Sequence, residues 1–382
     1  MHRIIVICLV AAMLMIGCQS PQKKVLPVVT ATATAETGAQ SGSKNTFSIV
    51  DSLNKVSEQG DIMATVQEKN SFFIFVSKDE KNIIYHWNLE NGKQIKRKLG
   101  SILVGNIDVQ KNKGYYVFYD QNQKVVVTDA NFKTLDIVNV KNSMLNGSSE
   151  RNYCVLPGKK KIVYTREVLK GGQWYQEVIE CDYKGKKKRQ ICKIEDVDKN
   201  IGKVNSISQL VPSEDEKDLF FTGLYFKTRN ANETSSPCFG VINGQSGSIT
   251  AVQEEKNLAH LMENTMVFTD GLKEKGVLSS GYITCLSETG TKKKYYLDKK
   301  EESQEVTVSD HENYYIGYER FDDDRTELSG YLFKESGRKW KAKISHSVWG
   351  IWFFEDERML LYSYYDENQK LCFGRETINY DK

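Results

Sequence analysis

Residues Tyr153–Cys192, YCVLPGKKKIVYTREVLKGGQWYQEVIECDYKGKKKRQIC, hold four short apolar runs separated by turns. The runs are Tyr153–Leu156, Ile162–Arg166, Glu177–Asp182 and Arg189–Cys192. Each run is too short for a helix, and its Val, Ile and Tyr residues favour a pleated, half-buried strand. The breaks contain Pro157 and Gly158, Gly171 and Gly172, and Lys184 and Gly185, which are typical of turns. The stretch therefore predicts one small sheet of four antiparallel strands.

The same unit recurs along the chain, and its second strand is the easiest to recognise. The start-to-start spacings of the second strands are 44, 46, 58, 47, 48 and 45 residues. These strands are predicted at Ser71–Ser77, Tyr115–Asp120, Lys161–Arg166, Leu219–Leu224, Met266–Asp270, Tyr314–Arg320 and Met359–Tyr365. Third strands follow at Ile83–Leu89, Lys124–Ala130, Glu177–Tyr183, Cys238–Asn243, Tyr282–Ser287, Gly330–Lys334 and Leu371–Thr377. Most are closed by a turn with Gly, at Gly92, Gly185, Gly247, Gly290 and Gly337, which indicates a backbone position with φ > 0.

Seven such units indicate an all-β, seven-bladed β-propeller, in which strands A to D of each blade run from the inside outwards. The last unit has strands A (Ser347–Phe354), B and C, and no D strand is found before Lys382. Thr46–Val50 is a short apolar segment outside the seven units. We predict that it pairs with the last C strand and closes the ring, which would remove an open sheet edge. Six blades with extra strands and eight blades with degenerate sequence are the alternatives.

Two segments resemble a known class of repeat. Leu156–Tyr164, LPGKKKIVY, resembles the S-P-D-G-K-x-I-x-F turn of TolB-like and WD40-like propeller repeats, and Val211–Asp215 resembles it in part. Ile179–Gly185 is similar to the strand and turn that follow in those repeats. The other blades depart from this pattern, and no Trp-Asp signature occurs. The resemblance implies a propeller but says little about function, because propellers host many unrelated activities. The whole chain resembles a propeller lipoprotein of a Gram-positive bacterium.

The N-terminal segment resembles a lipoprotein signal. Arg3 precedes an apolar run from Ile4 to Ile16 that is too short to span a bilayer, which indicates a signal peptide over residues 1–17. Leu14–Cys18, LMIGC, resembles the lipobox of bacterial lipoproteins, which implies that Cys18 carries diacylglycerol and anchors the protein. An ordinary cleaved signal peptide is the alternative.

The composition changes after Cys18. Residues 18–45 are rich in Thr, Ala, Ser and Gly, which predicts a disordered tether with a reach of about 30 Å. The propeller domain is expected at residues 46–382, on the extracytoplasmic face of the cell membrane.

Charge and cysteine content limit the function further. The formal net charge of +3 does not favour nucleic-acid binding. Six cysteines follow Cys18, without a CxxC pair: Cys154, Cys181, Cys192, Cys238, Cys285 and Cys372. Two interpretations stay open, a disulfide between Cys181 and Cys192 or small buried side chains between blades. We expect a monomer without a metal or a cofactor.

Catalytic signatures are scarce. The sequence has no G-x-S-x-G, H-E-x-x-H or phosphate-binding Gly loop, and the predicted inner strands carry few of the carboxylates that glycosidases need. We therefore expect that the protein is not an enzyme. An acidic cluster is interpreted as a solvated hairpin tip rather than a Ca²⁺ site: Glu319, Asp322, Asp323, Asp324 and Glu327. Three basic runs are interpreted as solvated rather than as a surface for anionic polymers or lipids: Lys159–Lys161, Lys184–Arg189 and Lys292–Lys294.

The B–C and D–A loops share one face of a propeller, and we predict that this face binds the ligand. Its candidate residues are aromatics and arginines of the longest loops: Trp174, Tyr175, Phe226, Arg229, Phe321 and Arg325. Such side chains dominate binding hot spots. The sequence therefore predicts a membrane-anchored scaffold that binds a protein, a peptide or a polysaccharide. The alternatives are an extracellular enzyme acting on glycans or peptides, and a structural subunit of an envelope complex.

Overall fold

The structure is a computed structural model that describes residues 49–68, 71–79, 81–105, 107–140, 152–194, 203–226, 236–254, 256–262, 265–270, 282–287, 292–296, 305–308, 315–322, 325–332, 338–354 and 359–378. Contacts divide the chain into two units, Met1–Thr46 and Phe47–Lys382, and all described residues belong to the second. The predicted signal peptide, Cys18 and the tether lie outside the described residues and stay predictions. Among the described residues, no helix is long and apolar enough to cross a membrane.

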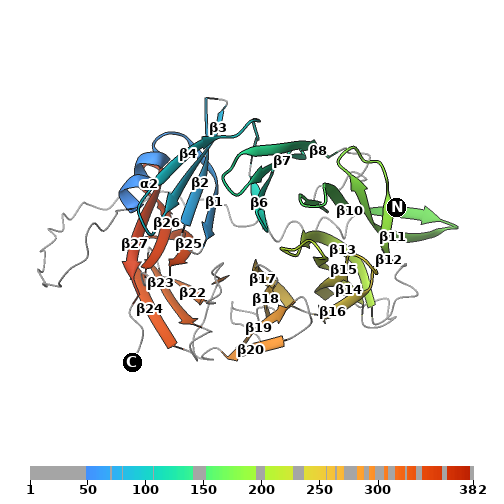
Figure 1. Ribbon diagram of the computed structural model, residues 1–382. Coiled ribbons are helices and arrows are strands. Elements are labelled where there is room, and N and C mark those ends of the chain that lie inside the picture. The colour runs from blue at the N-terminus through green and yellow to red at the C-terminus, as the bar shows by residue number, and fades with distance from the viewer. Residues whose placement is uncertain are drawn as a thin grey trace, which may run out of the picture. The chain divides into compact units, whose positions relative to one another are not determined.

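Seven antiparallel sheets follow one another along the described residues, and in each sheet every strand pairs with its neighbour in sequence (Figure 1). Blade 1 contains β1 (Asp61–Glu68), β2 (Ser71–Lys78), β3 (Lys81–Asn88) and β4 (Gln94–Lys98). Blade 2 contains β5 (Asp108–Asn112), β6 (Tyr115–Tyr119), β7 (Lys124–Asp129) and β8 (Thr134–Asn139). Blade 3 contains β9 (Tyr153–Leu156), β10 (Lys161–Lys170), β11 (Gln173–Asp182) and β12 (Arg189–Ile194). Blade 4 contains β13 (Lys203–Pro212), β14 (Asp218–Phe226), β15 (Ser236–Asn243) and β16 (Ile249–Glu254).

The last three sheets repeat this order. Blade 5 contains β17 (Lys256–Met262), β18 (Thr265–Asp270), β19 (Tyr282–Ser287) and β20 (Lys292–Tyr296). Blade 6 contains β21 (Glu305–Val308), β22 (Tyr315–Asp322), β23 (Arg325–Leu332) and β24 (Arg338–Ile344). Blade 7 contains three strands, β25 (Val348–Phe354), β26 (Met359–Tyr365) and β27 (Leu371–Thr377). The second and third strands of all seven predicted units are therefore confirmed, with shifts at some ends.

Neighbouring blades pack through alternate side chains of the same strands. On β2, Phe73 joins a buried cluster with Phe118 of blade 2, whereas Phe72 joins a cluster with Leu361 of blade 7. Successive side chains of a strand point to opposite faces, so both faces of blade 1 are covered. Further clusters join blades 2 and 3, blades 3 and 4, and blades 6 and 7. The strand β17 contacts both β15 and β21, so the remaining neighbours also touch.

This cyclic order of contacts, with blade 1 against blade 7, is that of a β-propeller. The prediction of an all-β propeller with four-stranded blades is confirmed. That the seven blades make up the complete ring stays a prediction.

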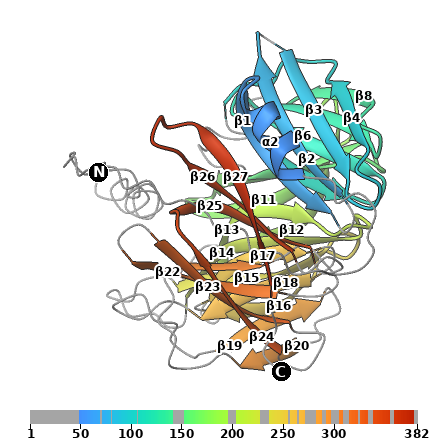
Figure 2. The ribbon, with the colours of Figure 1, turned by 90° about the vertical axis from the view of Figure 1, so that its left-hand side faces the viewer.

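The predicted closing strand is wrong. Ile49 and Val50, the last residues of the predicted strand Thr46–Val50, begin the helix α2 (Ile49–Ser57), and Thr46–Ser48 lie outside the described residues. The helix buries Ile49, Leu53 and Val56, a spacing that places them on one helical face. This face packs into the cluster that joins blades 1 and 7. Figure 2 shows α2 lying over the strands of blade 1.

A side chain of α2 takes the place of a fourth strand in blade 7. The Asn54 amide Nδ2 donates to the carbonyl oxygen of Phe373 at 3.2 Å, and the Phe373 backbone N–H donates to Asn54 Oδ1 at 2.8 Å. Phe373 lies in β27, which pairs with β26 on its other edge. The helix therefore satisfies part of the edge of β27 with an amide that mimics a backbone peptide group. Ser52 also accepts from the indole N–H of Trp87 in blade 1, at 2.9 Å.

Four of the described hairpin turns have the same hydrogen-bond pattern. Four aspartates accept hydrogen bonds from the backbone N–H groups two and four residues further on: Asp120, Asp129, Asp182 and Asp366. The residue three places after each aspartate has a positive φ. The predicted positive φ is confirmed for Gly92, Gly185 and Gly247, whereas Gly290 and Gly337 lie outside the described residues.

A buried carboxylate fastens three blades together. Glu216 lies in the turn between β13 and β14 and is 6% exposed. Its carboxylate accepts from Asn112 Nδ2 of blade 2 at 3.1 Å, and from the backbone N–H groups of Gly158 and Lys159 of blade 3 at 2.9 Å and 3.1 Å. Three donors satisfy the buried carboxylate, and these hydrogen bonds hold the A–B turns of blades 2, 3 and 4 together.

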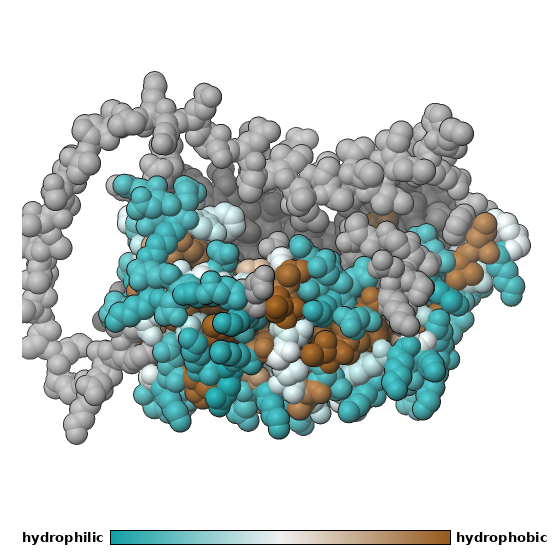
Figure 3. All heavy atoms as spheres, turned by 90° about the horizontal axis from the view of Figure 1, so that it is seen from above, coloured by the Kyte–Doolittle hydropathy of each residue, from teal (hydrophilic) through white to brown (hydrophobic). Residues whose placement is uncertain are grey.

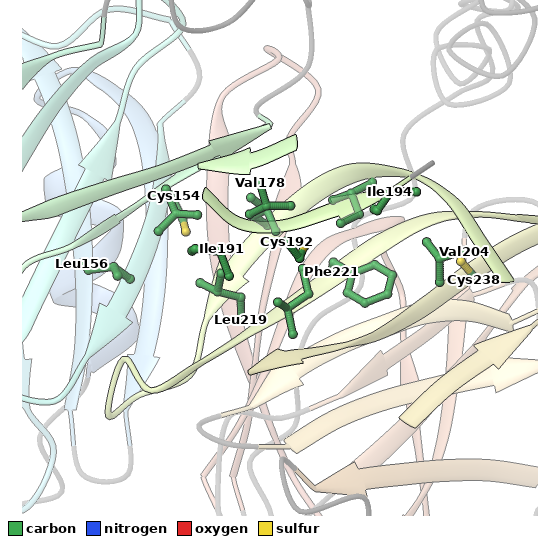
Figure 4. Packing of buried hydrophobic residues seen from close by; sticks show 14 residues of the cluster. Cys154, Leu156, Val178, Ile191, Cys192, Ile194, Val204, Leu219, Phe221 and Cys238 are labelled. Carbon is green, nitrogen blue, oxygen red and sulfur yellow. The ribbon is translucent and has the colours of Figure 1, made fainter. Parts of the chain in front are cut away.

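No disulfide joins the described cysteines, and most of them fill space between blades. Cys181 packs between blades 2 and 3, whereas Cys192 packs between blades 3 and 4 together with Cys154 and Cys238 (Figure 4). Cys181 and Cys192 thus point to opposite faces of blade 3, which excludes a disulfide between them in this fold. The interpretation as small buried side chains is confirmed for these four, and the side chain of Cys285 lies outside the described residues.

Candidate binding face

The alternation of strand direction gives the propeller two faces. The B–C turns and the D–A connections lie on one face, which we call the B–C face, and the A–B and C–D turns lie on the other. On the A–B and C–D side the described turns are short and polar, and Lys113, Lys160 and Lys188 are exposed there. Of the described large apolar side chains that are exposed, none lies in an A–B or C–D turn.

The B–C face carries most of the exposed apolar side chains. Leu169 ends the second strand of blade 3, and Ile102 and Val104 lie in the connection between blades 1 and 2. Trp349 begins strand β25 and Tyr365 ends strand β26, both in blade 7. The other two, Leu135 and Ile137, lie on β8, the outermost strand of blade 2. Because exposed apolar side chains lie mainly on the B–C face, this face is the better candidate for a binding surface.

Blade 7 contains an aromatic cluster on this face, formed by His346, Trp349, Tyr364 and Tyr365. Trp349 is 66% exposed, and its ring meets that of Tyr365 edge to face, with centroids 5.1 Å apart and planes at 88°. His346 stacks on Tyr364, with centroids 3.9 Å apart and planes at 11°. The two pairs offer apolar ring surfaces beside polar atoms, a combination that suits sugar rings and peptide side chains.

A β-bulge presents Trp349 to solvent. The pairing of β25 with β26 shifts register between Val348 and Gly350, and Trp349 is the extra residue. A bulge redirects a side chain, so Val348 is buried while its neighbour Trp349 is exposed. Burial raises the pKa of Tyr364, and the neighbouring Cys372 and Asp366 raise that pKa further, so the phenol stays neutral near pH 7. It is then available as both donor and acceptor for a ligand.

The long hairpin of β10 and β11 in blade 3 also lies on the B–C face. Its length differs from the sequence prediction. The predicted strands end at Arg166 and resume at Glu177, but β10 and β11 continue to a two-residue turn at Gly171 and Gly172, both with positive φ. The turn chemistry explains this result, because two such residues form the tight turn that joins paired strands. Near the tip, the ammonium group of Lys193 lies 4.0 Å from the ring centroid of Tyr175.

The base of the hairpin is braced against blade 4. Gln176 donates to the carbonyl oxygen of Ile207 at 2.9 Å and accepts from the Ile207 N–H at 2.7 Å. Arg166 and Glu177, which face each other across the two strands, form an ion pair at 2.7 Å. The hairpin is therefore a supported projection of the B–C face.

The structure places the predicted site residues as follows. Trp174 and Tyr175 follow the β10–β11 turn, Phe226 ends β14, and Phe321 and Arg325 flank the β22–β23 turn, all at B–C ends. Of these, Tyr175 has a described side chain, which is half-buried, whereas Arg229 lies outside the described residues. Their role in binding stays a prediction. The blade 7 aromatic cluster was missed, because the exposure of Trp349 depends on a bulge that no local pattern in the sequence reveals.

Metal binding was considered from the clusters of titratable side chains in the described part of the chain. Among the described residues, no group of three His, Cys, Asp or Glu side chains is placed to hold a metal ion. The acidic cluster of blade 6 has no described side chains, and Asp323 and Asp324 lie outside the described residues.

Comparisons with known proteins give weak structural similarities. No protein-family model matches the sequence, and no curated protein matches it. A chain in the crystal structure of the mitotic checkpoint complex has a TM-score of 0.40 and 13% identity, and the match covers 91% of this chain and 99% of that chain. The Myceliophteria thermophila Cps50 (Swd1) β-propeller domain has a TM-score of 0.39 and 10% identity, covering 82% and 98%. A eukaryotic initiation factor has a TM-score of 0.44 and 8% identity, covering 84% and 88%. The assignment as a β-propeller therefore rests on the sheets and interblade clusters of this chain itself.

Proposed function

We propose that this protein is a membrane-anchored, extracytoplasmic binding scaffold whose B–C face recognises a protein, a peptide or a polysaccharide. The observation that carries the proposal is the concentration of exposed apolar side chains on that face, with the blade 7 aromatic cluster as its largest element. The LMIGC sequence at Leu14–Cys18 supports anchoring through a diacylglyceryl group on Cys18. Two acyl chains give stable attachment, and the tether then keeps the propeller within about 30 Å of the bilayer.

The cluster offers the physical features of a binding hot spot. An exposed Trp loses much apolar surface to water when a ligand covers it, and an aromatic side chain has little conformational entropy to lose. The Tyr365 ring braces Trp349 from the side, so the indole is partly pre-oriented before a ligand arrives.

The test is photo-crosslinking on intact cells of the native host with the full-length protein. A crosslinking amino acid is placed at Leu169 or Tyr365 on the B–C face, and at Lys113 or Lys188 on the opposite face as a matched control. We expect discrete crosslinked products from the B–C positions alone. The double variant Trp349→Ala/Tyr365→Ala should abolish the product obtained through Leu169. Equal products from both faces, or an unchanged product in the double variant, would contradict the proposal.

The anchor is tested separately by Cys18→Ser. This variant should lose its acyl chains and leave the membrane fraction after removal of the signal segment. Retention of the variant in the membrane fraction with an unchanged mass would contradict lipidation.

A further inference from the structure

A surface that shares Ile102 with the B–C face combines exposed aliphatic side chains with exposed cations. It lies at the outer edges of blades 1 and 2, and we call it the basic–apolar rim. Its aliphatic residues are Ile102, Leu135 and Ile137, which are 45%, 46% and 47% exposed. Its basic residues are Arg97 and Lys98 at the end of β4 and Lys133 just before β8, all exposed. In Figure 3, which looks from above onto the side that carries β7 and β8 in Figure 1, brown residues gather among teal ones.

Hydrogen bonds hold the aliphatic residues together. The connection after β4 runs along β8, because the Gly100 N–H donates to Thr134 Oγ1 at 3.2 Å and the Lys124 ammonium donates to the Ile102 carbonyl oxygen at 3.0 Å. Thr134 begins β8, and Lys124 pairs with Asn139 at its other end. Ile102 is thereby fixed beside the strand that carries Leu135 and Ile137. Ile137 pairs with Val126, which packs toward blade 1, so its side chain faces the same side as this connection.

The cations of the rim have no acidic partners among the described residues. No ion pair involves Arg97, Lys98 or Lys133 within the described part of the chain. Asp129, four residues before Lys133, accepts the backbone N–H groups of its own turn through Oδ1. Asp136 of β8 lies on the opposite face of the strand, within 3.9 Å of Lys160. Among the described residues, these three positive charges of the rim are therefore not neutralised by ion pairs.

We propose that the basic–apolar rim docks on an anionic lipid bilayer, a step that rests on the proposed membrane anchoring. Cations near a bilayer are attracted by anionic headgroups, and exposed aliphatic side chains gain by entering the interfacial region. Charged side chains that prevent pairing with another sheet edge would explain the Lys and Arg residues of β4. They would not explain why Leu135 and Ile137 are exposed on β8, which is also an edge strand. A hydrated anionic polymer would attract the cations and gain nothing from the aliphatic side chains. Docking would orient the B–C face relative to the membrane surface.

The first test is sedimentation with vesicles of an equal mixture of phosphatidylcholine and phosphatidylglycerol. The protein is the full chain with Cys18→Ser, so that no acyl group holds it, and the N-terminal segment is the same in every variant. Neutralising three cations, Arg97→Gln/Lys98→Gln/Lys133→Gln, should weaken partitioning on the order of 100-fold. The matched control, Lys184→Gln/Lys186→Gln/Lys188→Gln, changes the same number of exposed charges on the A–B and C–D side and should leave partitioning unchanged.

The second test separates lipid from other anions. Ile102→Ser/Leu135→Ser/Ile137→Ser should lose the part of binding that persists at high salt, because that part depends on apolar contact. All three side chains are about half exposed, so the thermal midpoint should stay near that of the wild type. Hydrogen exchange on vesicles should slow at residues 99–105 and 132–139 and stay constant at residues 183–188.

Several outcomes would overturn the proposal. Equal loss in the rim and control charge variants would mean a general charge effect, and no loss in either would exclude the rim. An unaffected serine variant whose binding soluble polyphosphate competes away would indicate an anionic polymer. None of these results bears on crosslinking through the B–C face, so failure of docking is distinguishable from failure of the binding function.

Discussion

Asn54 closes the contact between the helix α2 and the strand β27, and its replacement tests that closure. Asn54→Ala removes two hydrogen bonds, one to the carbonyl oxygen and one from the N–H of Phe373. At about 1 kcal/mol net for each bond, plus about 1 kcal/mol for partly buried backbone groups left without partners, the loss is about 3 kcal/mol. Ala is the better helix former by about 0.5 kcal/mol, so the free energy of unfolding should fall by about 2.5 kcal/mol.

The assay is urea unfolding of the full chain, followed by far-UV circular dichroism and by tryptophan fluorescence. The matched control is Lys55→Ala, an exposed position of the same helix, which should change the free energy of unfolding by less than about 0.5 kcal/mol. Native-state hydrogen exchange gives a local readout, because the Phe373 amide should exchange faster in Asn54→Ala while amides of blade 3 stay protected. If Asn54→Ala is as stable as Lys55→Ala and exchange at Phe373 is unchanged, the closure by α2 is wrong.

Three further predictions concern buried polar groups. Glu216→Ala should lower the free energy of unfolding by about 3 kcal/mol in urea, because three donors lose a charged acceptor, whereas the exposed Glu367→Ala should not change it. Burial lowers the pKa of His86, and the charge of Glu68 opposes this shift, so the unfolded chain binds the proton more tightly than the folded chain. The free energy of unfolding should therefore fall as the pH drops below about 6.5. Unfolding curves of His86→Phe across that range should lack this pH dependence. Burial raises the pKa of Cys192 to about 11, so iodoacetamide should label Cys372 before Cys192 in the native protein. Peptide mass maps report the order of labelling, and early labelling of Cys192 would contradict its placement between blades.

The sequence is most informative where a turn residue and a burial pattern agree. The strands Met359–Tyr365, Tyr282–Ser287 and Leu371–Thr377 occur with the predicted bounds, because polar or Gly-containing turns end each apolar run. The β10–β11 hairpin is longer than its apolar runs, since pairing between strands continues through exposed polar residues that carry no burial signal. An expectation based on apolar runs alone therefore underestimates strands that project from the core.

Two features depend on contacts that no local pattern reveals. The helix α2 has nine residues, and three of its four apolar side chains are buried, which is a weak signal, so its stability comes from packing against blades 1 and 7. The TFSIV segment, whose Ile49 and Val50 begin this helix, contains residues that favour strands, and this propensity led to the wrong closure. Trp349 is exposed because of a bulge, and a bulge depends on the register between two strands. The candidate site was therefore predictable as a face of the fold, whereas its aromatic cluster was not.

The pairing of Asn54 with Phe373 also has a kinetic consequence. The two residues are 319 positions apart, so this contact forms only after the last strand has been synthesised. Contacts of such long sequence separation carry a large loop-closure entropy and slow the folding of β-proteins. Until β27 arrives, the apolar side of α2 and the blade 1 surface that receives blade 7 stay without their partner. A chain truncated before Leu371 would keep this apolar surface open, and chaperones that bind such surfaces would act on it during synthesis.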